Sequence, residues 1–177
     1  ATQYVGGVAG QAFASMGEKA MDGCVNNGKL SIVPVGFSCR LFIGGVCGGT
    51  PAVPTMQDGA EFGNYGAFVS CRNTADVEFV CSGQSKKTTY INMGGVLGYA
   101  EASITDCDNS GGLDVRLKSS ASSVKHAHQR PAIGGVAGTV LYNVTGCDNT
   151  GQVNVSGTFG EALPEMYESD SDQDETG

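Results

Sequence analysis

The sequence of 177 residues lacks tryptophan and is poor in charged side chains, which make up 16% of it. It has no apolar run near the roughly 18 residues that a membrane-spanning helix requires, so we expect no membrane-spanning segment. Only ten residues are lysine or arginine, and they form no concentrated basic stripe. Because binding to nucleic-acid phosphates needs such a stripe, we also expect no nucleic-acid partner.

No C-x-x-C pair occurs among the seven cysteines, which argues against a zinc site or a dithiol motif. Seven cysteines are nevertheless many for a cytosolic chain of this size. Two N-x-S/T triplets, which begin at Asn143 and Asn154, are glycosylation candidates and agree with secretion. We therefore expect a mature chain, or a segment of a longer one, located outside the cell or at its surface.

Acidic residues outnumber basic ones by 18 to 10, and seven of the acids lie after Gly160. Up to Gly160 the two signs nearly balance, since 18 acids minus the seven of the tail leave 11 against 10 basic residues. Residues 161–177 combine acidity with low hydrophobicity, a composition typical of a disordered tail or a solvated linker. We therefore predict one domain over residues 1–160, followed by an acidic tail.

Glycine is abundant, with 28 residues, and many of the glycines belong to an internal repeat. The word Gly-Gly-Val-x-Gly occurs four times, beginning at Gly6, Gly44, Gly94 and Gly134. Each copy is followed by a word of the form Cys-x-Asn, at Cys24, Cys71, Cys107 and Cys147. An alternating apolar run, such as Leu113 to Leu117, completes each unit. The units cover about residues 4–32, 42–80, 91–117 and 132–157.

The repeat predicts an all-β fold, a short parallel β-solenoid (β-helix) of about four coils with loop insertions. Runs of period 2 indicate strands with one buried face. Asn-Thr-Gly and Asn-Ser-Gly indicate turns, in which asparagine tolerates a left-handed backbone. The unit from Ile91 to Leu117 then reads as a coil made of strand, bend, short strand, turn and strand. One coil cannot bury its apolar side chains alone, whereas stacked coils share a continuous core.

Stacking in register places equivalent residues above one another. We expect a ladder of valines, a ladder of the Cys-x-Asn cysteines, and a ladder of asparagines whose side chains bond to one another along the axis. The glycines leave room where neighbouring backbones approach closely. The predicted valine ladder contains Val8, Val46, Val96 and Val136.

Gly-Gly-Val-x-Gly, followed by Cys-x-Asn-Thr/Ser-Gly and alternating valine, resembles the GLUG-motif repeats of large secreted and surface-bound proteins such as bacterial adhesins. The resemblance covers about residues 4–157. It implies a β-solenoid segment of an extracellular protein, with no catalytic residue and no cofactor in the repeat itself. The second unit departs most, because Ala75 replaces a glycine and residues 50–70 form a long insertion.

The cysteines allow two interpretations. The ladder positions Cys24, Cys71, Cys107 and Cys147 are either small buried side chains or partners in disulfides between coils, because coils about 4.8 Å apart lie within the disulfide window. The remaining three lie near insertions, which a covalent link would hold, and are better disulfide candidates: Cys39, Cys47 and Cys81. An odd total leaves at least one thiol free or paired outside the chain.

Two patterns suggest metal ligands, each with a simpler explanation. Asp106, Asp108 and Ser110 match the opening of a calcium loop, but Leu117 occupies the position of the required glutamate, so an ordinary turn is favoured. His126 and His128 lie on one face of an extended segment and form half of a metal site at most. Without a third ligand, solvated loop histidines are favoured.

The functional prediction is a non-catalytic extracellular structural or adhesive module that self-associates or belongs to a fibre or surface assembly, with a surface glycan as a further potential partner. The alternative is a β-helix that binds or cleaves polysaccharide, with chemistry on one strand face. The residues available for that chemistry are Asp106, Asp108, Asp114, Arg116 and Lys118. Their alternation with apolar residues favours a solvent-facing strand surface.

Overall fold

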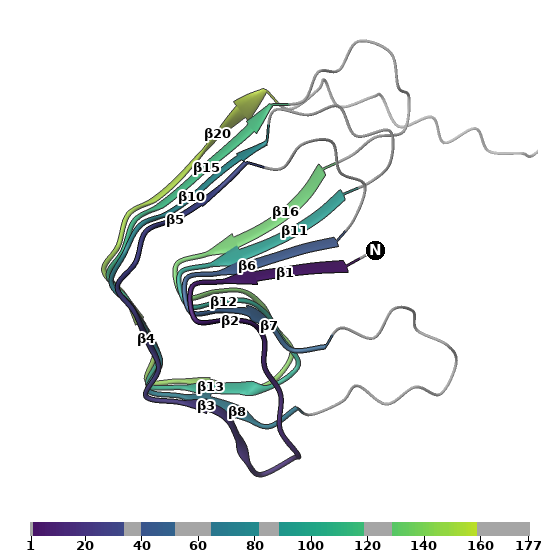
Figure 1. The fold of residues 1–177 in the computed structure, drawn as a ribbon, viewed down its shortest axis with the longest axis vertical. Helices are drawn as coiled ribbons and strands as arrows, with labels where there is room; N and C mark the ends of the chain where they lie inside the picture. The colour runs from purple at the N-terminus through teal and green to yellow at the C-terminus, as the bar shows by residue number, and fades with distance from the viewer. Residues whose placement is uncertain (1, 34–39, 52–64, 82–88, 119–128, 159–177) are drawn as a thin grey trace, which may run out of the picture.

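The computed structural model describes residues 2–33, 40–51, 65–81, 89–118 and 129–158. Within these residues the chain forms twenty short strands and no helix, and every strand pairing is parallel. The chain winds through four coils with five strands each, and the strands of successive coils lie one above the other (Figure 1). The predicted all-β parallel solenoid is confirmed. We number the coils 1 to 4 in chain order.

Equivalent strands form five sheets, A to E, in the order in which each coil visits them. Sheet A contains β1 (Thr2–Gly6), β6 (Arg40–Gly44), β11 (Thr89–Gly94) and β16 (Gln129–Gly134). Sheet B contains β2 (Ala9–Gln11), β7 (Cys47–Gly49), β12 (Leu97–Ala100) and β17 (Ala137–Val140). Sheet C contains β3 (Lys19–Asp22), β8 (Ala67–Val69), β13 (Ser103–Thr105) and β18 (Val144–Thr145).

The last two sheets close each coil. Sheet D contains β4 (Val25–Asn26), β9 (Arg72–Asn73), β14 (Asp108–Asn109) and β19 (Asp148–Asn149). Sheet E contains β5 (Leu30–Ile32), β10 (Val77–Cys81), β15 (Leu113–Lys118) and β20 (Val153–Thr158). In all five sheets the strands of coils 2 and 3 lie inside, and those of coils 1 and 4 form the two edges.

The valines of the glycine word lie above one another, as predicted. The backbone N–H of Val8 donates to the carbonyl of Val46 at 2.9 Å, and the N–H of Val46 donates to that of Val96 at 3.0 Å. The N–H of Val96 in turn donates to the carbonyl of Val136 at 2.8 Å. The second unit keeps this register with the third in its described strands, in spite of its insertion, whereas its pairing with the first unit in sheet C has an irregularity between Lys19 and Met21.

The apolar side chains form two separate clusters. One lies between sheets A and E, where Ile43 and Met93 face Phe79 and Val115. The other is enclosed by sheets B, C and D and includes Phe68 and Ile104. Figure 1 shows the reason, because sheet A turns back sharply into sheet B before the chain continues to sheet C.

Two details differ from the sequence-based expectation. Each coil has five short strands, because the segment after the glycine word breaks into sheets B and C, and the Cys-x-Asn word forms sheet D. The left-handed backbone predicted for asparagine was wrong, since the asparagines lie in strands. Positive φ occurs instead at the residue before each ladder cysteine, at Gly23, Ser70, Asp106 and Gly146. This residue makes the sharp corner between sheets C and D, and the asparagine beyond it points inward.

Candidate functional site

The chain turns from sheet A into sheet B at the glycine word of each coil. The three glycines of the word lie too close to neighbouring atoms to carry a Cβ atom. In coil 3, a methyl group at Gly94 would lie 2.1 Å from a carbonyl oxygen of the same turn. One at Gly95 would lie 2.1 Å from the Cγ of Asn109. One at Gly98 would lie 2.6 Å from the carbonyl oxygen of Gly48 in coil 2. Packing within and between coils therefore requires all three glycines.

The four asparagines of the Cys-x-Asn words form a continuous hydrogen-bonded ladder. The Nδ2 of Asn26 donates to the Oδ1 of Asn73 at 2.8 Å, and Asn73 donates in the same way to Asn109 at 2.8 Å. Asn109 donates to Asn149 at 2.7 Å. Each Nδ2 also donates to a carbonyl two residues further along its own coil, at 2.7 to 2.9 Å. The predicted asparagine ladder is confirmed.

The ladder lies against the second glycine of each glycine word and separates the two apolar clusters. Asn73 and Asn109 are fully buried there. A buried amide is costly unless its hydrogen-bonding groups are satisfied, and here each coil supplies the partner for the next. The ladder therefore stabilises a stack only when the coils are in register.

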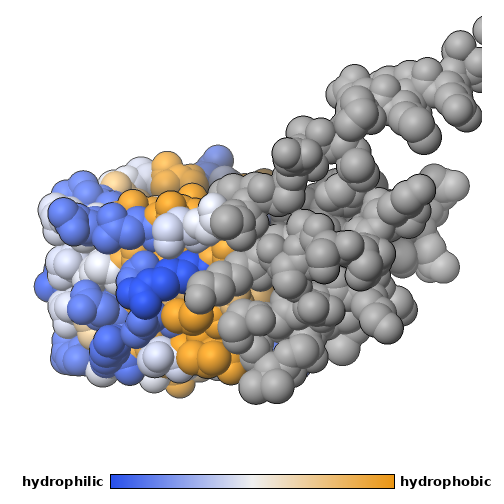
Figure 2. Space-filling view, turned by 90° about the horizontal axis from the view of Figure 1, so that it is seen from above, coloured by the Kyte–Doolittle hydropathy of each residue, from blue (hydrophilic) through white to orange (hydrophobic). Residues whose placement is uncertain are grey.

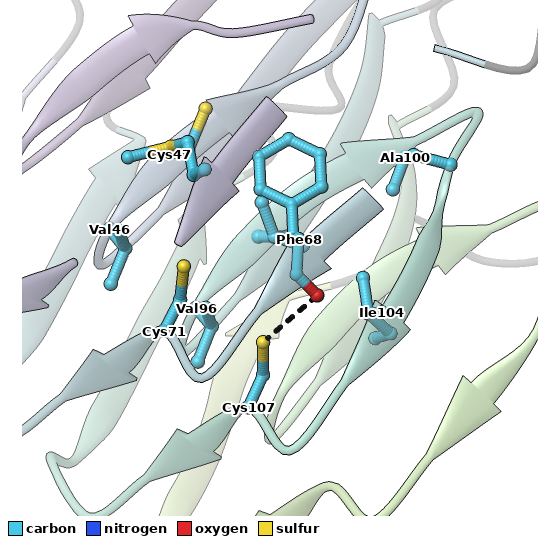
Figure 3. Packing of buried hydrophobic residues seen from close by; sticks show 11 residues of the cluster. Val46, Cys47, Phe68, Cys71, Val96, Ala100, Ile104 and Cys107 are labelled. Carbon is cyan, nitrogen blue, oxygen red and sulfur yellow. Dashed lines mark hydrogen bonds between the residues drawn. The ribbon is translucent and has the colours of Figure 1, made fainter. Parts of the chain in front are cut away.

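The cysteines of the Cys-x-Asn words form a second column, in the cluster of sheets B, C and D. Cys71 and Cys107 are fully buried, whereas Cys24 and Cys147 are half-buried at the two ends. The thiol of Cys107 donates to the carbonyl oxygen of Phe68 at 3.6 Å, and it lies close to Cys71 (Figure 3). No disulfide links any two cysteines of the described ranges. Of the two interpretations, the structure has the ladder as buried thiols.

The other three disulfide candidates are the cysteines near the insertions. Cys47 is a buried free thiol next to the column, so the structure does not bear out its predicted disulfide. Cys81 is buried between sheets A and E. Cys39 lies outside the described residues. The predicted link across an insertion fails at Cys47 because its side chain points into the core beside Val46 and Val96.

Burial and hydrogen bonding shift the thiol pKa values of Cys47 and of two column cysteines, Cys71 and Cys107. Burial raises the pKa of Cys47 to about 11. The hydrogen bond with Cys107 lowers the pKa of Cys71 to about 7, because it stabilises a thiolate there. The same bond, together with burial, raises the pKa of Cys107. The thiols of the column lie one in each coil, spaced along the axis rather than gathered around a point.

The calcium candidates do not converge on one point. Asp106 makes the left-handed corner and is exposed, whereas Asp108 belongs to β14 and its carboxylate lies 3.4 Å from the guanidinium of Arg72 in the coil below. The hydroxyl of Ser110 points to the carbonyl of Asn73 at 3.5 Å. The structure contains no group of three or more His, Cys, Asp or Glu side chains suited to a metal ion within its described ranges.

The outer face of sheet E carries the densest group of charges among the described residues. Glu78 lies 3.2 Å from the ammonium of Lys29 and 3.6 Å from the guanidinium of Arg116. Arg116 also contacts Asp114, and this hydrogen bond raises the pKa of the guanidinium. A shallow depression of about 280 Å³ lies among these side chains and also contacts Asn154.

Of the residues considered for polysaccharide chemistry whose side chains are described, the structure joins only Asp114 and Arg116 in an ion pair. Asp106 and Asp108 lie at the corner between sheets C and D and in sheet D. Lys118 ends β15, and its side chain is not described. His126 and His128 and the acidic tail also lie outside the described residues. The glycosylation candidates Asn143 and Asn154 are both exposed in coil 4.

A polar and aromatic cluster between sheets A and B has no counterpart in the sequence-based prediction. The hydroxyl of Tyr99 donates to the Oε1 of the buried Glu101 at 2.6 Å, and burial together with this bond raises the pKa of Tyr99. The ring of Tyr99 stacks on Phe42 with centroids 4.8 Å apart. These residues occur in only one or two units, so the repeat pattern contains no signal for them.

Comparisons of the chain with protein-family models, with curated proteins and with solved structures find no match. The described part of the chain contains no helix with the length and hydrophobicity needed to span a bilayer.

Proposed function

We propose that this chain is a non-catalytic structural and adhesive module of an extracellular or cell-surface protein, and that it works by self-association. The extracellular location in this proposal comes from the resemblance of the repeat to GLUG-motif repeats. The main support for self-association is the in-register stack itself, whose two outermost coils leave five strand edges each without a partner strand in the described residues. Such parallel edges recruit further strands.

The distribution of chemical groups also supports a structural role. In the described residues, the recurring geometry of the repeat rests on glycines, valines and a hydrogen-bonded ladder, which hold coils together. The charged groups of sheet E are paired with one another on an open face. A catalytic carboxylate pair needs free acid and base functions on both sides of a bound substrate.

The decisive experiment is electron microscopy of the purified chain over a range of concentrations, with light scattering on the same samples. Self-association predicts particles that lengthen along one axis as concentration rises. Single particles of constant size at every concentration would contradict the self-associating function. Reducing agent should leave the result unchanged, because the described thiols that line the core take no part in disulfides.

A second candidate is polysaccharide binding or cleavage on sheet E, which the depression beside Glu78, Asp114 and Arg116 favours. Its test is a panel of acidic and neutral polysaccharides, with binding and release of reducing or unsaturated ends measured separately. Activity that disappears in Glu78→Gln but persists in Asp76→Asn would identify Glu78 as a reacting group. If the chain neither binds nor cleaves any polysaccharide of the panel, this second candidate function is excluded for those polysaccharides.

A further inference from the structure

The two ends of the stack have matching chemistry. Coil 1 and coil 4 carry the same five-residue word, Gly-Gly-Val-Ala-Gly, beginning at Gly6 and Gly134. All neighbouring strands in a sheet are parallel, so a strand added beyond coil 4 must run in the same direction as the edge strand of coil 4. Strands β1 to β5 of another molecule can meet this requirement, one in each sheet. Coil 1 of a second copy is therefore equivalent to a fifth coil.

The asparagine ladder gives the two ends complementary hydrogen-bonding groups. Every step of the ladder donates from Nδ2 of one coil to Oδ1 of the next. At the Asn26 end, the Oδ1 accepts only the backbone N–H of Gly28 among the described groups, at 3.1 Å. Asn149, in coil 4, already accepts a bond on its Oδ1. A further copy continues the ladder only when its Asn149 donates to this Asn26, or its Asn26 accepts from this Asn149.

Each joint thus has one donor side and one acceptor side. The Nδ2 of Asn26 donates inward to coil 2, so the ladder runs from coil 1 to coil 4. At the coil 4 end, the Nδ2 of Asn149 bonds only to the carbonyl of Gly151 among the described groups, whereas the equivalent amides of the other coils also donate to the next coil. The Oδ1 of Asn26 in the next molecule is the acceptor that continues the pattern. Two coil 1 ends, or two coil 4 ends, placed face to face cannot form this hydrogen bond in the pattern of the ladder.

Core positions are exposed at the coil 4 end. Val144, Val153 and Val155 are 55%, 40% and 47% exposed. Their equivalents in coil 3 are at most 1% exposed: Ile104, Leu113 and Val115. In Figure 2 hydrophobic side chains reach the rim of the stack. Another coil stacked on this end would bury the apolar surface of these valines, just as coil 4 buries the equivalent side chains of coil 3.

The outward-facing positions are compatible across such a joint. Extending the register of sheets C, D and E places Thr145 beside Asp22, Asp148 beside Val25, and Asn154 beside Ser31. No pair in this set combines two like charges, which would oppose strand pairing. The small side chains Ala137 and Ala9 meet at the turn, where each glycine word needs space.

We infer that copies of this chain join head to tail, with coil 4 of one molecule paired in register with coil 1 of the next and Asn149 Nδ2 donating to Asn26 Oδ1 across the joint. The inference rests on the proposed self-association and specifies its geometry. The partner is a second copy of the chain, and the joint repeats the contacts between coils 3 and 4.

Cross-linking between two single variants tests the register. Asn154→Cys and Ser31→Cys place thiols on neighbouring strands about 4.8 Å apart across the joint, within the range for a disulfide. The full chain is made without glycosylation, the variants are mixed and oxidised, and the linked peptides are identified by mass spectrometry. We expect a disulfide between the two introduced thiols in the mixture and no dimeric link in either variant alone.

Asp114→Cys is the matched control, because it lies in the same column but inside the stack. Mixed with Ser31→Cys, it should give no link between molecules. A symmetric link of Asn154→Cys with itself would overturn the head-to-tail joint, and so would self-association without the expected link. If the chain does not associate at any concentration, the proposed function itself fails, which microscopy of the unmodified chain detects.

A charge at the exposed core position provides the second test. Val155→Glu should raise the concentration needed for association by roughly tenfold or more, because the joint would bury an unpaired carboxylate. Ser156→Glu, on the outer face of the same strand and beside Arg116 of coil 3, should have little effect. Circular dichroism of both variants at low concentration checks that the monomer keeps its fold. Equal association of both folded variants would overturn the proposed joint.

Discussion

Coil 3 and coil 4 have closely similar sequences but different environments. Both contain the glycine word, the Cys-Asp-Asn word and an alternating run, and their strands pair position by position. In coil 3 the inward side chains are buried on both sides by neighbouring coils, whereas in coil 4 the equivalent residues are half-buried or exposed. Burial in this fold therefore depends on the place of a coil in the stack, and stability comes from contacts between neighbours.

The largest expected effect follows substitution of a glycine in the glycine word of an inner coil, compared with a glycine of an outer coil that has open space around it. We expect Gly95→Ala to lower the free energy of unfolding by roughly 3 kcal/mol, because its Cβ would overlap the buried ladder. The nearest atom to a Cβ there is the Cγ of Asn109 at 2.1 Å. Urea unfolding followed by circular dichroism measures the change.

Gly28→Ala is the control in coil 1, where the nearest atom to the new Cβ lies 3.6 Å away. This variant should stay within about 0.5 kcal/mol of the parent chain, as ordinary surface substitutions do. Similar losses for both variants would show that glycine matters for chain flexibility rather than for close approach.

A smaller contrast is expected within the asparagine ladder. Asn109→Ala removes one bond to each neighbouring coil and leaves the Nδ2 of Asn73 facing a buried gap, so we expect a loss of about 2–3 kcal/mol. Asn149→Ala removes only one bond to a neighbouring coil, at an exposed end where water can replace its bonds, and should cost about 1 kcal/mol or less. Urea unfolding compares the two variants. Equal losses of unfolding free energy would contradict a ladder in which each asparagine is stabilised by the coils on both sides.

The fold was largely predictable from the sequence because its strongest constraint is repeated. Val8, Val46, Val96 and Val136 occupy one position in each unit, and the close approach that requires each glycine also produces the word that reveals it. The corners were not predictable, since the left-handed position holds glycine in two coils but serine and aspartate in the other two: Gly23, Ser70, Asp106 and Gly146.

Features of single coils were equally hidden. Tyr99 stacks on Phe42 because sheet B folds back on sheet A, a three-dimensional contact without a repeated sequence pattern. The state of the cysteines was also left open by spacing, because disulfides and buried thiols both suit coils that lie one strand apart. The structure has Cys47, Cys71 and Cys107 as buried thiols within one apolar cluster.

The smallest expected effect concerns alkaline pH. The folded chain holds the proton of Cys47 until about pH 11, whereas the unfolded thiol releases it near pH 9.0. Between these values the unfolded state binds fewer protons, so the free energy of unfolding should fall as pH rises. Cys47→Ala should make this fall less steep in urea titrations.

The neighbouring Val46→Ala serves as the control for Cys47→Ala, since it also removes buried volume but has no titrating group. It should lower stability by a similar amount at every pH and keep the slope of the parent chain. A parallel slope for Cys47→Ala would contradict a buried neutral thiol at this position.

The aligned amides have an electrical consequence. Backbone dipoles in a sheet largely cancel, because they alternate in direction. The side-chain amides of Asn26, Asn73, Asn109 and Asn149 all point the same way, so their dipoles add along the stack. The molecule therefore has a positive and a negative pole on its long hydrogen-bonded column, and a polymer built from it would grow with two unequal tips.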